Sequence, residues 1–180
     1  MADFTKALEV VLDHEGWGSY TTHPLDKGGP TRWGITLSTL AAWRGQPVDP
    51  ADVEALTREE ATAIYRAEYW APMHGDEVTD QVVATKNFDA AVNMGTGTAS
   101  RLVQIACHWC GRSVYLDGVF GPITLAALNR CDPEEFIHQM SESMRMHYRG
   151  IVARDPSQRV FLKGWLARAS WGDDLGPGVA

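Results

Sequence analysis

Three residues near the N-terminus carry the side chains that acid-catalysed cleavage of a sugar bond requires. Glu15, Asp26 and Thr31 lie in the stretch HEGWGSYTTHPLDKGGPTRWGIT, residues 14–36. Glu15 follows a helical pattern, so its carboxyl group faces the negative end of the helix dipole, which disfavours ionisation. A carboxylic acid that remains protonated near neutral pH can act as a general acid. We therefore predict that Glu15 donates a proton.

Asp26 and Thr31 extend this hypothesis across the glycine-rich turn. A hairpin would bring Asp26 back to face Glu15 and leave room for a sugar ring and an attacking water, which the Thr31 hydroxyl would hold. Taken singly, each carboxylate is better explained structurally: DKGG forms a turn in which Asp26 bonds its own backbone, and Glu15 is a frayed helix end. Taken together, they favour a catalytic pair.

Three further residues are candidates for binding a sugar. Tyr20 and Trp33 could stack on sugar faces, and Asn93, near the end of a helical pattern, could bond an N-acetyl group. Core packing explains the two aromatic residues equally well, and helix termination explains Asn93. All three stay substrate-binding candidates.

The elements that must position these residues are mostly helices. The segment from Trp17 to Gly34 is rich in Gly, Pro and Thr and predicts a small irregular sheet or hairpin. The fold class is therefore mainly α (α+β), with one β insertion near the N-terminus. Apolar spacing, capping residues and Gly or Pro stops predict helices over residues 4–14, 36–43, 50–56, 58–70, 80–94, 99–110, 122–129, 133–153 and 157–171.

Length and charge exclude several classes of protein. A chain of 180 residues that is 44% hydrophobic can form one globular domain with a substantial core. A net charge of −7 argues against nucleic acid as a partner. No apolar run approaches the length of a membrane span, and residues 1–9 lack the pattern of a signal peptide. We expect synthesis in the cytoplasm and no membrane insertion.

The cysteines and histidines do not predict a metal site. Three cysteines, Cys107, Cys110 and Cys131, are too few for a disulfide framework. A zinc site formed with His108 is possible on paper, but cysteines in a helical pattern usually behave as small buried apolar residues. Four other histidines show no metal-ligand spacing: His14, His23, His74 and His138.

The catalytic candidates also resemble those of a known family. The order Glu, Asp, Thr on a helix and hairpin resembles the catalytic set of phage-type lysozymes. The segments HEG, Tyr20, HP, Asp26, GG, Thr31 and GIT resemble the N-terminal signature of glycoside hydrolase family 108, the N-acetylmuramidases of phage endolysins and related secretion systems. The later blocks LTREEATAIYRAEYW, NFDAAVNMG, DGVFGPIT and FLKGWLAR are also similar to that family.

This resemblance extends from Phe4 to about Arg168 and implies a lysozyme-like helical domain over residues 1–180. It divides the chain into a catalytic lobe, residues 4–94, and a helical region resembling peptidoglycan-binding modules, residues 95–171. The run EGWGSY is two residues longer than the EGGY usual in the family, and Trp17 would add a stacking surface there.

The resemblance implies hydrolysis of the β-1,4 bond between N-acetylmuramic acid and N-acetylglucosamine in peptidoglycan. Glu15 would protonate the leaving oxygen, Asp26 would stabilise positive charge on the sugar carbon, and Thr31 would position water. We expect no cofactor and no metal. We also expect a monomeric, bacteriolytic and antimicrobial endolysin that acts on glycan strands after release through a holin or a secretion system.

Two other functions remain open. A lytic transglycosylase would use Glu15 on the same bond and release an anhydro sugar, with little use for Asp26. A non-catalytic cell-wall-binding protein would share the shape and sediment with walls without clearing them. A regulatory or nucleic-acid-binding helical protein is disfavoured by the net charge of −7.

Overall fold

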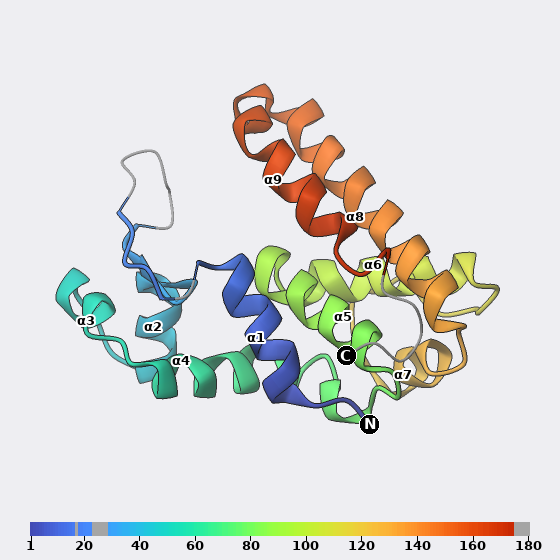
Figure 1. The fold of residues 1–180 in the computed structure, drawn as a ribbon, viewed down its shortest axis with the longest axis horizontal. Coiled ribbons are helices and arrows are strands. Elements are labelled where there is room, and N and C mark those ends of the chain that lie inside the picture. The colour runs from blue at the N-terminus through green and yellow to red at the C-terminus, as the bar shows by residue number, and fades with distance from the viewer. Residues whose placement is uncertain (17, 23–28, 175–180) are drawn as a thin grey trace.

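The computed structural model describes residues 1–16, 18–22 and 29–174, and most of them are helical (Figure 1). The mainly α fold class with a small antiparallel sheet is therefore confirmed. The α-helices are α1 (Phe4–His14), α2 (Leu37–Arg44), α3 (Pro50–Glu54), α4 (Arg58–Tyr65), α5 (Gln81–Met94), α6 (Thr96–Trp109), α7 (Pro122–Leu128), α8 (Pro133–Arg154) and α9 (Arg159–Ser170).

Helix α5 lies in the middle of the molecule, with α1 and α6 packed along it (Figure 1). Its residues 82–91 are all buried, which means that the helix is covered on every side. Two of these buried residues, Lys86 and Asp89, carry charge. Because a buried charge is unfavourable without a partner, both must be paired inside the protein.

Helix α1 forms as its sequence pattern predicts. The Asp3 side chain caps the helix by accepting hydrogen bonds from the backbone amides of Thr5 and Lys6. One apolar face is buried, and the helix ends at His14, with Glu15 as its C-terminal cap. The buried residues of this face are Phe4, Ala7, Leu8, Val11 and Leu12.

The sheet lies between α1 and α2 in sequence and is a hairpin of two strands, each two residues long. Strand β1 (Thr31–Arg32) pairs antiparallel with β2 (Ile35–Thr36), and an isolated bridge adds Thr21 opposite Thr31. The turn residues Trp33 and Gly34 both have positive φ, 53° and 71°, as a two-residue hairpin turn requires. The described hairpin therefore turns at Trp33–Gly34, after DKGG, and residues 26–28 lie outside the described residues.

Several helix boundaries differ from the sequence predictions, among them the start of α9, which is Arg159 rather than residue 157. The predicted helix over residues 58–70 is α-helical only to Tyr65 and continues as a π-helix, Arg66–Trp70. This wider turn accompanies a hydrogen bond from the Trp70 indole to Asp76, 2.9 Å. Helix α6 begins at Thr96 rather than at residue 99, because Gly95, with φ 83°, allows a sharp turn directly after α5. Helix α3 ends at Glu54, two residues earlier than predicted.

The last two long helices form an antiparallel pair that ends beside α5. Helix α8 leads through Asp155 and a 3-10 turn, Pro156–Gln158, into α9, which runs back along α8 (Figure 1). The buried Lys86 ammonium donates hydrogen bonds to the backbone carbonyls of Ala169 and Trp171, each 2.5 Å. A lysine on α5 thus satisfies the free carbonyls at the end of α9.

A continuous cluster of buried apolar side chains extends from Phe4 on α1 to Ala169 on α9. It joins the N-terminal elements to the C-terminal helices through α5 and α6. Within the described residues, no helix is both long and apolar enough to cross a membrane.

Lys86 makes stability depend on pH. Burial lowers its pKa from 10.5 to about 8, so between these values the unfolded chain keeps a proton that the folded chain has lost. The free energy of unfolding should therefore rise with pH in this window, by up to ~1.4 kcal/mol per pH unit. In the variant Lys86→Met this rise should be absent. Urea unfolding of both proteins between pH 7.5 and 9.5 measures it, and parallel curves would contradict the assignment.

Candidate active site

Glu15 lies where α1 ends, with its side chain 22% exposed. Its backbone amide still bonds to the Val11 carbonyl, so the preceding helix fixes its position. The carboxyl group is thus held in place while part of it remains open to solvent. This placement meets the first requirement of a residue that must reach a substrate.

An arginine from the other end of the chain binds the Glu15 carboxylate. Arg168 Nη1 donates to Glu15 Oε1 over 2.8 Å, although the two residues are 153 positions apart in sequence. The same guanidinium makes a bidentate pair with Asp89, in which Nε lies 2.9 Å from Oδ2 and Nη2 lies 2.8 Å from Oδ1. Arg168 therefore connects the exposed Glu15 to the buried Asp89.

His14 completes this ionic network. Its Nδ1 lies 2.8 Å from Oδ1 of Asp89, whose side chain is only 1% exposed. Burial disfavours the ionised form of Asp89, but the hydrogen bond from His14 and the charge of Arg168 lower the pKa of Asp89 below its ordinary value. Burial likewise disfavours charged Arg168, yet Asp89 and Glu15 raise the pKa of the guanidinium. Asp89 and Arg168 therefore form an ionised pair.

The hairpin turn packs directly against the Glu15 side chain. A Cβ atom at Gly34 would lie 2.9 Å from Glu15 Cγ and Oε2 and 2.4 Å from the Tyr65 hydroxyl, so only glycine fits there. The Tyr65 hydroxyl donates to the Trp33 carbonyl over 2.6 Å, which fixes the turn. Burial, followed by the nearby Glu15 charge, raises the pKa of Tyr65. Tyr65 therefore stays neutral and holds the wall of the site.

The sequence pattern does not reveal the Arg168 guanidinium beside Glu15. A guanidinium at this position can stabilise the carboxylate that remains after the side chain has given up a proton.

Two hollows each include a residue that interacts with Glu15. One, of about 540 Å³, lies against α9 and is lined partly by Arg168, Asn93 and Trp165. The other, of about 440 Å³, lies between α2, the π-helix and the α5–α6 junction and is lined partly by Trp43 and Tyr69. Burial, then the Glu68 and Glu15 charges, raise the pKa of Tyr69. Glu15 is therefore linked through Arg168 to one hollow and through its charge on Tyr69 to the other. Hollows with aromatic walls near a carboxyl group suit a saccharide substrate.

Comparison with known proteins agrees with this geometry. The family model for glycosyl hydrolase 108 matches residues 8–95, and a model described as a predicted peptidoglycan domain matches residues 98–170. The solved structure of Brucella abortus SagA has 36% sequence identity and a TM-score of 0.79 to this chain, over 93% of this chain and 89% of SagA. A search of curated proteins finds no significant match.

The chain belongs to the glycosyl hydrolase 108 family. The resemblance seen in the sequence is thereby confirmed. Together with the peptidoglycan domain, family membership identifies this chain as a glycoside hydrolase whose substrate is peptidoglycan. Glu15 and the hairpin lie within the hydrolase match, whereas Arg168 lies within the peptidoglycan domain match.

Of the other two catalytic candidates of this family 108 hydrolase, the structure describes Thr31 but not Asp26. Thr31 lies on β1 of the same hairpin, and its hydroxyl donates to the Gly29 carbonyl over 3.2 Å. Asp26 lies outside the described residues. The structure thus brings the hairpin to Glu15, and the catalytic roles of Asp26 and Thr31 stay predictions.

The binding candidates occupy different environments. Tyr20 is 37% exposed. Trp33 is half-buried: its indole donates to the Leu56 carbonyl over 3.2 Å, and its ring covers Gly18. These contacts give Trp33 a packing role. Asn93 lines the hollow against α9, and its Oδ1 accepts a hydrogen bond from the Tyr148 hydroxyl over 2.7 Å.

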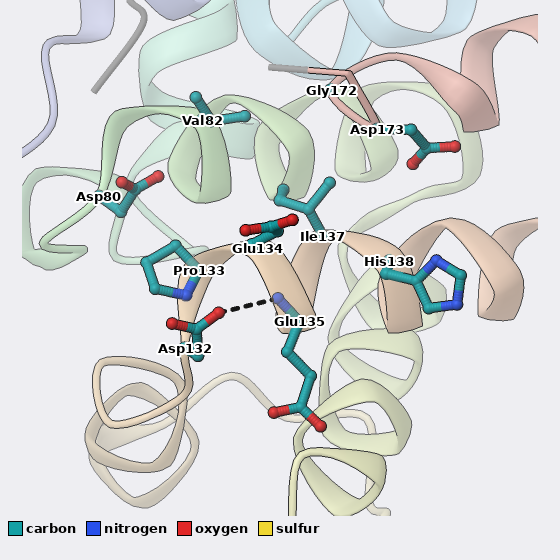
Figure 2. Close-up of a pocket in the computed structure, with 10 residues that line it drawn as sticks. All are labelled: Asp80, Val82, Asp132, Pro133, Glu134, Glu135, Ile137, His138, Gly172 and Asp173. Atoms are coloured by element: carbon teal, nitrogen blue, oxygen red, sulfur yellow. Dashed lines mark hydrogen bonds between the residues drawn. The ribbon is translucent and has the colours of Figure 1, made fainter. Parts of the chain in front are cut away.

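A third hollow, of about 390 Å³, lies at the start of α8, and none of its lining residues belongs to the network around Glu15 (Figure 2). It is acidic, but three of its carboxylates have structural partners. Asp80 and Asp132 cap α5 and α8, and Asp173 accepts hydrogen bonds from Ser141 and Arg145. Helix capping and pairing with α8 thus account for these three carboxylates.

The cysteines do not form a metal site with His108. The Cys107 and Cys131 sulfur atoms lie 4.0 Å apart, whereas His108 Nε2 lies 2.8 Å from the Val114 carbonyl oxygen. Cys107 is buried, and Cys110 and Cys131 are half-buried. Among the described residues, no group of three or more His, Cys, Asp or Glu could hold a metal ion.

Sequence reasoning did not identify Arg168, Asp89 or Tyr65 as parts of the site. One signal was present: NFDAAV places an acidic residue inside a helix that is otherwise largely apolar. A buried carboxylate requires a cation or several donors, so Asp89 indicates a distant partner. Sequence spacing cannot show which arginine supplies it.

The network predicts a large stability cost for losing Arg168. The variant Arg168→Met leaves the buried Asp89 carboxylate with His14 alone and should destabilise the protein by ~3 kcal/mol or more. In the control variant Arg58→Met, which loses an exposed pair with Glu9, the loss should be below ~1 kcal/mol. Urea unfolding at pH 7 compares them. Equal losses would show that Asp89 does not depend on Arg168.

Proposed function

We propose that this hydrolase is an N-acetylmuramidase that cleaves the β-1,4 bond between N-acetylmuramic acid and N-acetylglucosamine. The observation that carries the proposal is the position of Glu15: a partly exposed carboxyl group at a fixed helix end, bound by an arginine that lines a hollow with aromatic walls. Family membership supports it, because the residues that match the family signature include Glu15.

In the proposed reaction Glu15 gives its proton to the glycosidic oxygen as the bond to the sugar carbon breaks. Asp26 stabilises the positive charge that develops on that carbon, and Thr31 positions the attacking water. The water loses a proton to Asp26 or to solvent. Arg168, 2.8 Å from Glu15 Oε1, stabilises the carboxylate that proton transfer leaves behind. Solvent then returns a proton to Glu15.

The central test replaces the acid without changing its size. Glu15→Gln should lower the release of reducing sugar from purified peptidoglycan by about 100-fold or more, because the amide cannot donate a proton to the leaving oxygen. Glu9→Gln, on the exposed side of the same helix, should retain wild-type activity. Equal release by Glu15→Gln and wild type would contradict the proposal.

Mass spectrometry of the same digests identifies the reaction class. Hydrolysis adds one water to each cleaved strand, whereas a lytic transglycosylase leaves an anhydro sugar. Anhydro products from the wild-type protein would contradict the muramidase proposal and identify a lytic transglycosylase. Wall sedimentation without any cleavage would indicate a binding protein.

A second prediction concerns the two residues on the hairpin side. Asp26→Asn should lower kcat more than it raises KM, because the Asp26 charge acts mainly when the sugar carbon becomes cationic. Thr31→Val should also lower kcat, whereas Thr31→Ser, which keeps the hydroxyl group, should stay close to wild type. Steady-state kinetics on soluble glycan strands give both constants. If Asp26→Asn changes KM and leaves kcat unchanged, the proposed catalytic role of Asp26 is wrong.

We further propose that the protein acts as a monomeric endolysin or secreted bacteriolytic enzyme that reaches the wall through a holin or a secretion system. The proposed division into a catalytic lobe, residues 4–94, and a wall-binding region, residues 95–171, fits this role. Its support is the pairing of a hydrolase match with a peptidoglycan domain match in one chain.

A further inference from the structure

The hollow of about 540 Å³ beside α9 combines groups from both parts of the chain. His14 comes from α1 and Asn93 from α5, whereas Trp165, Arg168 and Trp171 come from α9 and the residue after it. Arg168 both lines this hollow and binds Glu15, and His14 directly precedes Glu15. The hollow is therefore adjacent to the proposed acid.

Aromatic rings supply apolar walls to this hollow. Trp165 is stacked on Tyr148, with ring centroids 5.3 Å apart and an interplanar angle of 19°. The Trp171 ring meets the His14 ring edge-on, with centroids 6.4 Å apart. Gly164 also lines the hollow and leaves open space, since a Cβ there would meet no atom within 4 Å. Fixed indole rings beside open space can contact the apolar face of a sugar ring.

Two polar groups in the hollow are held in defined orientations. Asn93 Oδ1 accepts from Tyr148, and among the described residues its Nδ2 makes no hydrogen bond, so the amide N–H groups remain as donors. The carboxylate of Asp89 can only accept, which makes His14 Nδ1 a donor. In the imidazole tautomer that carries its proton on Nδ1, Nε2 is a hydrogen-bond acceptor. A donor and an acceptor match the acetamide carbonyl and a hydroxyl of an N-acetylated sugar.

We infer that this hollow is a saccharide subsite that binds one N-acetylated sugar of the glycan strand next to the cleaved bond. The inference rests on the proposed function and adds a direct substrate-binding role for the C-terminal helix. In it, Trp171 and Trp165 contact the sugar face, the Asn93 amide donates to the acetamide oxygen, and Arg168 links the occupied subsite to Glu15. Substrate is thus bound jointly by the two family segments.

The experiment measures binding in the full-length Glu15→Gln protein, which should not turn the ligand over. Isothermal calorimetry with a tetramer of N-acetylglucosamine gives Kd, and a tetramer of unacetylated glucosamine tests recognition of the acetyl group. We expect binding of the acetylated tetramer at least tenfold tighter than that of the unacetylated one. Equal affinities, or no binding of the acetylated tetramer, would overturn the inference.

Two further substitutions in the same protein test the walls. Trp171→Ala should raise Kd tenfold or more, and it keeps the backbone carbonyl that Lys86 binds. Asn93→Asp keeps an acceptor for Tyr148, loses the amide donor, and should also raise Kd tenfold. Trp109→Ala, an exposed tryptophan on α6 outside the hollow, is the matched control and should leave Kd unchanged.

The same substitutions in the active protein separate this inference from the proposed function. Trp171→Ala should raise KM for glycan strands with little change in kcat, while circular dichroism confirms that the protein is folded. If wild type hydrolyses peptidoglycan and both Trp171→Ala and Asn93→Asp keep its KM, the subsite is wrong and the muramidase proposal stands. If wild type does not hydrolyse peptidoglycan, the muramidase proposal fails, whatever the tetramer binding shows.

Discussion

The buried carboxylate of Asp89 determines how three helices meet at the active site. An ionised group with 1% exposure is unfavourable unless nearly all of its hydrogen-bonding capacity is used. His14 from α1 and Arg168 from α9 satisfy it on α5. Because both partners must lie within hydrogen-bond distance of one carboxyl group, the ends of α1 and α9 are brought together, and Glu15 is placed between them.

This constraint makes the two family segments parts of one site. The hydrolase segment supplies Glu15, and the peptidoglycan domain segment supplies the arginine that binds it. Lys86 holds the end of α9 from the same central helix, so the position of Arg168 depends on two contacts of α5. A glycan strand bound at the proposed subsite on the C-terminal helices would therefore be linked to the proposed acid through Arg168.

Sequence patterns predict elements well where the determinants are local. Asp3, Thr57 and Asp80 cap helices near the predicted starts, because a cap needs only a side-chain acceptor and the next few amides. The π-helix at Arg66–Trp70 was not predicted, since it accompanies a contact between Trp70 and Asp76 beyond the helix. The hairpin turn was also missed: Trp33 has positive φ, which is uncommon for a bulky residue, and Tyr65 holds its carbonyl.

The sequence by itself determined the mainly helical class, most helix boundaries, the family and the position of Glu15 at the end of α1, because periodicity, caps and a motif are encoded in neighbouring residues. Only the tertiary structure decided that Arg168 binds Glu15, that Gly34 packs on its side chain, and that Asn93 shares a hollow with α9. These contacts join residues up to 153 positions apart, and hydrogen bonds across such distances leave no periodic trace in the chain.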